Sequence, residues 1–285
     1  MDTNPAEAHV ELEGINYYTL LEEPSHGAPN APCILLIHAL MSNLHMWDAT
    51  VQQLHATGHR TLRYDHVGHH NTPPAHDPTV TYHLDDLTRH AHQLVKSRTG
   101  QAHAKAVIGC SIGGSMAFRY ASLFPDDVDG IISIASPGIK SPASAQELWT
   151  QRIEQFEKDV KTGDDVLCHQ TIARWFPGSR PEDDGVRAEA LQHVKTCDLR
   201  GYSVLADAIR GYDYTSHMSE IGDRVKTLVV AGEEDQAGRA DVLRDVAGGI
   251  PGAEFVVLGR TGHLPPMQRA GEFWGVMGGF LRSLG

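Results

Sequence analysis

The chain has 285 residues, and 41% of them are hydrophobic, which is enough to bury the core of one globular unit with an inserted subdomain. Its formal net charge is −12, with 36 acidic residues against 24 basic ones and no dense basic run, which argues against nucleic acid or an anionic membrane as the main partner. Residues 1–9 lack an apolar leader, and no stretch approaches the roughly 18 apolar residues that span a bilayer, so we expect a cytoplasmic protein.

Cysteines and histidines show no pattern typical of a disulfide framework or a metal site. The cysteines are Cys33, Cys110, Cys168 and Cys197. They form no C-x-x-C pair, which is typical of reduced thiols. One histidine cluster consists of His66, His69, His70 and His76. It lies in a proline-rich loop without ligand periodicity, so we expect neither a metal nor a cofactor.

Eight short apolar or β-branched runs predict eight strands. They span residues 10–13, 15–20, 34–37, 60–64, 106–109, 131–135, 227–231 and 255–258. The later runs are apolar throughout, as expected of parallel strands that helices cover on both faces. The first two alternate between polar and apolar residues, which predicts an antiparallel hairpin at the edge of the sheet.

Helical patterns lie between these strands. Apolar residues recur at spacings of three and four from Leu84 to Val95, which places them on one helix face, and Gly100 marks the end of that helix. The alternation of strands and helices predicts an α/β fold with a doubly wound, mostly parallel eight-stranded sheet. Ligands of such sheets bind beyond the carboxyl ends of the strands, so the functional motifs should lie there.

A helical lid is expected after the sixth strand. From residue 137 to residue 216 the strand signal disappears, and an apolar helical spacing runs from Trp149 to Val160 and stops before Gly163. The predicted segments are 1–136 for the first part of the core, 137–216 for the lid and 217–285 for the second part of the core.

A nucleophilic serine is predicted at Ser111. Residues 109–113 read Gly-Cys-Ser-Ile-Gly and match G-x-S-x-G between an apolar strand and a small-residue helix. This context holds the serine in a strained turn, and the flanking glycines let the strand and the helix approach closely. The amide of Ile112, at the helix start, is the expected oxyanion donor. A dinucleotide-binding G-x-G-x-x-G would require glycine at position 111, which argues against a bound dinucleotide.

His263 and Asp235 complete the predicted catalytic triad. A serine hydroxyl requires a general base, and His263 follows the last predicted strand in a Gly-His loop. The expected chain order is serine, acid and histidine, which assigns Asp235 as the acid. Glu233 and Glu234 lie next to it and stay open as alternatives. The second oxyanion donor is expected in the loop after the third strand, at the amide of Leu40.

These segments resemble the α/β-hydrolase superfamily over nearly the whole chain. Residues 38–40 read His-Ala-Leu, similar to its His-Gly-x loop, and residues 64–69 read Tyr-Asp-His-Val-Gly-His, similar to its Asp-x-x-Gly-His turn. Ala39 and His70 stand where the family usually has glycine, and the segment from Gln236 lacks the proline common after the acid. These departures leave the triad intact and the substrate open.

Within the superfamily the chain is most similar to the 3-oxoadipate enol-lactonases. Residues 149–152 read Trp-Thr-Gln-Arg, residues 174–176 read Arg-Trp-Phe, and residues 201–210 begin Gly-Tyr and end Ile-Arg, as in the lid helices of that family. Residues 228–235 and 250–254 are also similar to the corresponding segments of that family. The resemblance implies a serine hydrolase that cleaves a lactone or ester of a small organic acid through an acyl-enzyme.

The resemblance also places substrate-binding residues in the lid. If the substrate is a small anionic lactone, Arg152, Arg174 and Arg210 are candidates to bind its carboxylate. Each arginine is equally well interpreted as a solvent-exposed charge on a helix surface. Trp149 and Trp175 are candidates for the wall of an acyl pocket or for lid core. The remaining substrate-contact candidates are His38 and Leu264.

The same triad supports other reactions, which the sequence leaves open. An acyltransferase would replace water with an alcohol or a thiol, and a C–C bond hydrolase or a cyclase would use the triad for proton transfer. A non-catalytic small-molecule receptor is disfavoured because all three triad positions are filled. We expect a small-molecule partner, with neither nucleic acid nor membrane, and we leave a homodimer open.

Overall fold

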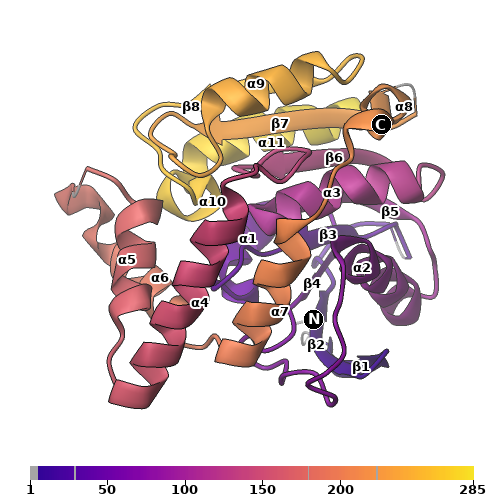
Figure 1. The fold of residues 1–285 in the computed structure, drawn as a ribbon. Helices are drawn as coiled ribbons and strands as arrows, with labels where there is room; N and C mark the ends of the chain where they lie inside the picture. The colour runs from indigo at the N-terminus through magenta and orange to yellow at the C-terminus, as the bar shows by residue number, and fades with distance from the viewer. Residues whose placement is uncertain (1–5, 29, 179, 223) are drawn as a thin grey trace.

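The computed structural model describes residues 6–28, 30–178, 180–222 and 224–285, which contain one eight-stranded sheet (Figure 1). Its strands are β1 (Ala6–Leu12), β2 (Ile15–Glu22), β3 (Ile34–Ile37), β4 (Thr61–Tyr64), β5 (Ala104–Cys110), β6 (Val128–Ile134), β7 (Lys226–Gly232) and β8 (Glu254–Leu258). They lie in the order β1-β2-β4-β3-β5-β6-β7-β8. β2 pairs antiparallel with β1 and β4, and the remaining pairs are parallel. The predicted doubly wound, mostly parallel sheet is confirmed.

The edge hairpin of β1 and β2 is present as predicted, but β1 begins four residues earlier than its apolar signal. The register pairs Leu12 with Ile15 and Ala6 with Leu21, so the hairpin extends well beyond the residues 10–13 of the prediction. The outer part of β1 alternates between exposed and half-buried residues and packs little apolar surface. Backbone pairing with β2 therefore defines the start of β1, and the hydropathy of the sequence does not indicate where this strand begins.

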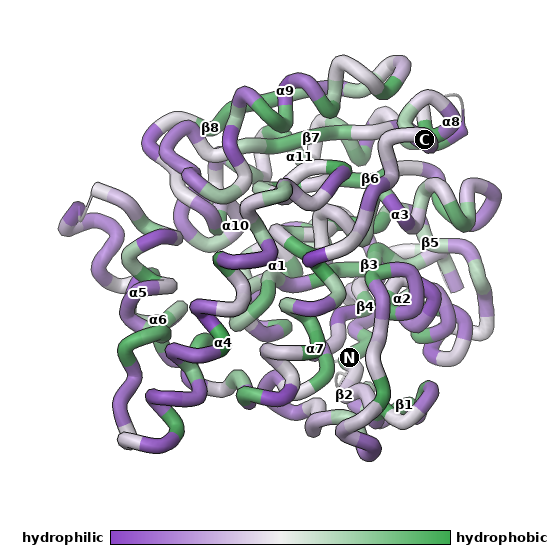
Figure 2. The backbone as a smooth tube through the Cα atoms, in the orientation of Figure 1, coloured by the Kyte–Doolittle hydropathy of each residue, from purple (hydrophilic) through white to green (hydrophobic). Residues whose placement is uncertain are grey.

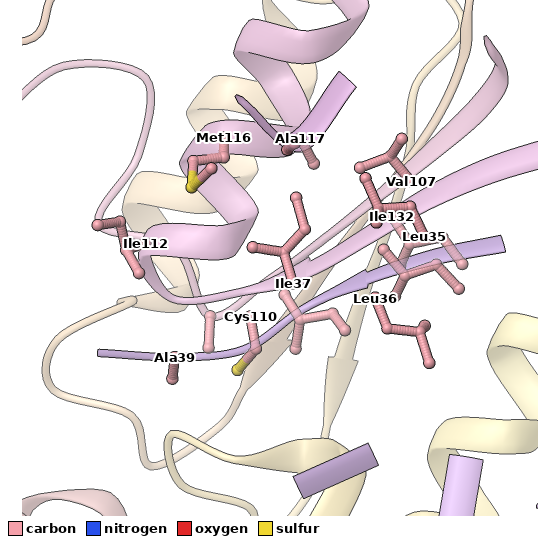
Figure 3. Packing of buried hydrophobic residues seen from close by; sticks show 14 of the residues in the cluster. Leu35, Leu36, Ile37, Ala39, Val107, Cys110, Ile112, Met116, Ala117 and Ile132 are labelled. Carbon is pink, nitrogen blue, oxygen red and sulfur yellow. The ribbon is translucent and has the colours of Figure 1, made fainter. Parts of the chain in front are cut away.

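Helices cover both faces of the sheet centre. All four residues of β3 are buried, and because neighbouring side chains of a strand point to opposite faces, both faces must be covered. The flanking helices are α1 (Asp48–Ala56), α2 (Leu84–Thr99), α3 (Ile112–Leu123), α9 (Ala240–Gly248), α10 (Pro265–Gln268) and α11 (Ala270–Ser283). α1 contacts α11, and α2 contacts α3. Figure 3 shows Met116 and Ala117 of α3 beside the apolar side chains of β3, β5 and β6.

The helix predicted from Leu84 ends where expected. α2 stops at Thr99, and Gly100 takes the left-handed conformation with φ 74°, which L-residues other than glycine adopt only with strain. The acidic residues Asp85 and Asp86 occupy the first turn, where they complement the helix dipole. Local signals alone therefore fix both ends of this helix.

The chain between β6 and β7 is helical, and its described residues contain no named strand. It forms α4 (Ala145–Thr162), α5 (Val166–Trp175), α6 (Asp184–Val194), α7 (Leu199–Arg210) and α8 (Met218–Gly222), with the short 3-10 helices η2 (Pro181–Asp183) and η3 (Thr215–His217). A third 3-10 helix, η1 (Leu44–Trp47), follows β3. Figure 1 shows α4 to α7 as one group beside the sheet. The division of the chain at residues 136/137 and 216/217 stays a prediction.

The predicted apolar face of α4 is shorter than its spacing suggests. Phe156 is buried and Gly163 ends the helix with φ 77°, as expected, but Val160 is 61% exposed. Figure 2 shows the contrast between α4, which is largely hydrophilic, and the hydrophobic strand β7. The last turn of α4 therefore buries no apolar side chain, although Asp159 in this turn is buried and accepts the Leu167 amide of α5 at 2.7 Å. Among the described residues, no helix combines the length and hydrophobicity that crossing a bilayer requires.

Candidate active site

Ser111 occupies the sharp turn between β5 and α3. Its backbone has φ 58° and ψ −118°, a strained conformation for a residue other than glycine. The Ser111 amide donates to the carbonyl of Ile134 in β6 at 2.8 Å, which fixes the turn to the sheet. A Cβ atom on Gly109 would lie 1.9 Å from the carbonyl oxygen of Gly113, so this turn closes only with glycine at position 109. The sequence motif thus dictates the backbone that exposes the hydroxyl.

His263 and Asp235 lie in the loops after β8 and β7 and are bonded to each other. His263 Nδ1 donates to Asp235 Oδ2 at 2.8 Å, and both residues are buried. Asp235 Oδ1 accepts the Ala237 amide at 2.8 Å. Burial alone would raise the pKa of the Asp235 carboxyl, but attraction to His263 and the hydrogen bonds it accepts together lower this pKa below its usual range. The ionised carboxylate therefore fixes the tautomer that leaves His263 Nε2 with its lone pair.

The neighbouring glutamates are engaged elsewhere. Glu233 Oε2 accepts the amide of Arg260 at 2.8 Å, and Glu234 pairs with Arg180. Of the three acidic residues in this loop, Asp235 is thus the one that the structure brings to the histidine.

The loop of His263 is joined to the end of α5. The His263 amide donates to the carbonyl of Trp175 at 2.8 Å. The same carbonyl oxygen lies 2.1 Å from the position that a Cβ atom on Gly262 would take, so the two backbones touch. The Trp175 indole also lies nearly parallel to the imidazole, with ring centroids 6.1 Å apart.

Ser111 and His263 face one cavity but are not joined by a hydrogen bond in the described structure. Both residues line a cavity of ≈ 90 Å³ together with Leu40 and with side chains of α4, α5 and α7. A long distance between nucleophile and base is common without substrate, and it tightens when the reacting complex forms. The cavity therefore presents the hydroxyl, the base and one predicted oxyanion donor to the same space.

Two backbone amides remain free to hold an oxyanion. In the described residues, the amides of Leu40 and Ile112 have no hydrogen-bond partner. On either side of Leu40, the Ala39 amide donates to the sulfur of Met46 at 3.4 Å and the Met41 amide donates to a histidine nitrogen at 3.1 Å. The Ile112 amide is free because it opens α3, where no preceding helical carbonyl can reach it. The two free donors are the two that the sequence predicts.

The lid helices α4 and α5 contribute two arginines to the cavity, and neither has a carboxylate partner among the described residues. Arg152 and Arg174 both line the cavity, and neither forms an ion pair there. The guanidinium of Arg152 lies 4.8 Å from the ring centroid of Trp149, and Arg174 donates to Thr171 Oγ1 at 2.7 Å. Burial, followed by repulsion from Arg152, lowers the pKa of Arg174 to about 10, and burial also lowers the pKa of Arg152. Both stay charged at neutral pH, so this part of the cavity attracts anions.

Four predicted substrate-binding residues line the cavity, namely Trp149, Arg152, Arg174 and Trp175. The others do not, and these predictions are corrected here. His38 is fully buried, with Nδ1 donating to the Ala39 carbonyl at 2.8 Å and Nε2 accepting the His66 amide at 2.9 Å. Leu264 is also fully buried, outside the cavity, at the start of α10. Arg210 lies 3.4 Å from Asp207 of its own helix and does not reach the cavity.

Six cavity residues were not predicted as site residues. They are Met41, Pro137, Thr171, Tyr202, Ile209 and Ala237. Tyr202 and Ile209 are seven residues apart on α7 and therefore lie on one helix face. Tyr202 belongs to the Gly-Tyr segment of the lid, so the helical spacing from this tyrosine could have indicated the face that lines the cavity.

The histidine cluster of residues 66–76 forms no metal site. His66 and His69 are buried and bonded to backbone groups, whereas His70 and His76 are exposed. In the described part of the chain, no group of three or more histidine, cysteine or acidic side chains is arranged to hold a metal ion.

Comparison with known proteins finds similar proteins over nearly the whole chain. The family described as alpha/beta hydrolase fold matches residues 32–162. A monoacylglycerol lipase of Rattus norvegicus is 23% identical over 286 residues, which cover 94% of this chain and 79% of the lipase. The enol-lactonase of Burkholderia xenovorans superposes with a TM-score of 0.83 at 26% identity, covering 96% of this chain and 100% of that one. A thermophilic esterase of Thermogutta terrifontis gives a TM-score of 0.82 at 20% identity and covers 99% of both chains.

Proposed function

Because this chain is an ester or lactone hydrolase of the α/β-hydrolase superfamily, we propose that it cleaves a lactone or ester of a small organic acid that carries a free carboxylate. One observation carries the proposal: Arg152 and Arg174, two half-buried positive charges without a carboxylate partner among the described residues, share a cavity with Ser111. Partial removal of a charge from water is costly unless the charge is paired, so a substrate carboxylate would supply the missing partner. The enol-lactonase of Burkholderia xenovorans, at 26% identity, supports a lactone substrate.

The size of the cavity supports a small substrate. Its volume is ≈ 90 Å³, whereas pockets for drug-sized ligands span about 300–1,000 Å³. Trp149 and Trp175 narrow it from the lid side. This volume favours a short acyl group over a long acyl chain.

The proposed reaction begins with attack by Ser111. His263 Nε2 removes the hydroxyl proton as Ser111 Oγ bonds to the carbonyl carbon, and the Asp235 carboxylate stabilises the imidazolium that forms. The amides of Leu40 and Ile112 donate to the oxyanion. When the ring C–O bond breaks, the leaving oxygen takes the proton from His263 and stays attached to the acyl group, because a lactone is cyclic.

Hydrolysis of the acyl-enzyme restores the site. Water enters, and His263 Nε2 removes one of its protons while the water oxygen bonds to the acyl carbon. The bond to Ser111 Oγ then breaks, and Ser111 Oγ recovers the proton. One water is consumed, and the product is an acid with a second carboxylate for the arginines to release.

A matched substrate pair tests the proposal. The enzyme is first treated with a fluorophosphonate, with the label located by intact mass and peptide analysis, and is then assayed on aryl esters of a short diacid and on the same esters with the free carboxylate methylated. We expect the label on Ser111 and a kcat/KM at least about 10-fold higher for the free carboxylate, since a charge-assisted hydrogen bond contributes about 1.5–3 kcal/mol. Equal rates for both esters would contradict the anionic substrate, and absence of both label and turnover would contradict the serine hydrolase mechanism.

A further inference from the structure

His69, in the loop after β4, makes contacts unlike those of its neighbours in the chain. Its ring is fully buried. Nδ1 donates to the carbonyl of Val67 at 2.8 Å, and Nε2 accepts the amide of Met41 at 3.1 Å. The thiol of Cys197, in the turn before α7, approaches the same Nε2 at 3.3 Å. The imidazole thus joins the loop after β4 to the loop after β3, which supplies the oxyanion donor.

The partners of His69 fix its tautomer. A carbonyl oxygen can only accept and an amide can only donate, so Nδ1 carries the hydrogen and Nε2 carries the lone pair. Protonation of Nε2 would break the bond to the Met41 amide. The ring therefore serves as a neutral hydrogen-bond acceptor for the backbone of Met41.

Met41 needs this support because its backbone is strained. Its φ is 67°, in the left-handed region, which is uncommon and strained for residues other than glycine and asparagine. The turn brings the Ser42 amide back to the carbonyl of Ala39 at 2.9 Å. Between these bonded amides, the Leu40 amide remains free and borders the cavity. Holding Met41 in this conformation is what leaves the Leu40 amide available.

We propose that His69 is a positioning residue for the oxyanion hole: its Nε2 anchors the Met41 amide and thereby holds the Leu40 amide on the position of the developing oxyanion. The inference rests on the proposed function of the site. His69 does not contact the cavity, so its effect reaches the reaction only through the loop. Loss of the anchor lets Met41 relax to an unstrained conformation, which displaces the Leu40 amide and weakens transition-state binding more than substrate binding.

Two amide variants separate the two ends of the imidazole. In His69→Gln, the side-chain oxygen reaches the position of Nε2 and can accept the Met41 amide. In His69→Asn, the shorter amide reaches only the position of Nδ1 and can still bond Val67. The matched control is Cys197→Ala, which removes the other neighbour of Nε2 and leaves the Met41 bond in place.

The expected results distinguish positioning from packing. We expect His69→Asn to lower kcat about 10- to 100-fold with KM within about threefold, and to slow phosphonylation of Ser111 by a similar factor, because a misplaced oxyanion donor acts on the transition state. His69→Gln should retain kcat within about threefold, and Cys197→Ala should match the parent enzyme. Thermal unfolding of each variant verifies that it is folded.

Several outcomes would overturn the proposal. His69→Asn with unchanged kcat would do so, as would equal loss in the asparagine and glutamine variants with KM raised in both. If the asparagine variant does not fold, ¹⁵N NMR of the parent protein decides, since the proposal requires a protonated Nδ1, an unprotonated Nε2 and a coupling across the hydrogen bond to the Met41 amide nitrogen. A parent enzyme that is neither labelled nor active refutes the proposed function, whereas an active parent with an unaffected asparagine variant refutes only the role of His69.

Discussion

The two walls of the cavity differ in how their polar groups are satisfied. On the sheet side, Asp235 and His263 bond each other and the oxyanion loop is fixed by buried hydrogen bonds. On the lid side, Arg152 and Arg174 repel each other and have no carboxylate partner among the described residues. The acid and the base of the sheet wall are thus paired without a ligand, whereas the two charges of the lid wall are not. This contrast separates the chemistry of the site, which the fold fixes, from recognition, which a substrate completes.

The largest expected effect comes from removing the nucleophile on the sheet wall. Ser111→Ala should lower kcat by at least about 10⁴-fold and abolish fluorophosphonate labelling, because the covalent step is lost. The fold should persist, since alanine at this turn carries the same backbone strain as serine. Steady-state kinetics with intact mass and thermal unfolding measure both parts. Residual turnover within 10-fold of the parent would place the chemistry elsewhere.

Neutralising the acid on the same wall should have the next largest effect. Asp235→Asn should reduce kcat by about 10³- to 10⁴-fold, because an amide in this place favours the wrong tautomer of His263. The control is Glu233→Gln, whose amide oxygen can still accept from the Arg260 amide. If the glutamate variant lost as much activity as the asparagine variant, the acid would be assigned wrongly.

Changing the lid wall should alter selectivity rather than chemistry. We expect Arg174→Met to lower kcat/KM for carboxylate-bearing esters about 10- to 100-fold and to leave the methylated esters within about threefold, since one charge-assisted hydrogen bond is lost. Arg210→Met, a change on α7 and outside the cavity, should leave both values unaltered. An equal loss on both ester types would mean that Arg174 supports the fold of the lid instead.

The smallest expected effect is a loss of stability at acid pH, caused by the buried histidines His66 and His69. Burial lowers the pKa of His69 from its usual 6.5 to about 4 and that of His66 to about 3. Between pH 6.5 and these values the unfolded chain binds more protons, so stability is complete above about pH 6.5 and decreases as the pH falls. For His69 the loss at pH 5 is about 2 kcal/mol.

Thermal unfolding between pH 7.5 and 5 measures this loss. His69→Gln cannot titrate and should show a smaller decrease than the parent protein. Asp65 acts in the opposite direction, because burial raises the pKa of its carboxyl to about 6, so the difference between parent and variant is the quantity to compare. Identical pH profiles for the two proteins would exclude a depressed pKa at His69.

The sequence predicts the sheet wall better than the lid wall, for a physical reason. Ser111, Asp235 and His263 follow strand ends, and the carboxyl ends of parallel strands meet in space, so strand order and motif place them together. Which lid side chains line the cavity depends on the rotation of each helix against its neighbours. That packing puts Ile209 into the wall and Arg210, the next residue, outside it.

Two residues on the sheet side were predicted to contact substrate because they lie next to site residues in the sequence, and both predictions were wrong. His38 precedes the oxyanion loop and Leu264 follows the histidine base, yet both side chains point into the core. Along extended backbone, successive side chains leave in opposite directions, so a neighbour of a functional residue tends to face away from the site. A buried histidine bonded only to backbone groups has no sequence signature that separates it from a ligand-binding one.

The hydrogen bond between the His263 amide and the Trp175 carbonyl couples the loop of the base to the last turn of α5. The two backbones also touch at Gly262, so one cannot move away from the other without breaking this contact. If this end of the lid moved outward, it would pull the imidazole away from Ser111, and the enzyme would be inactive in that conformation.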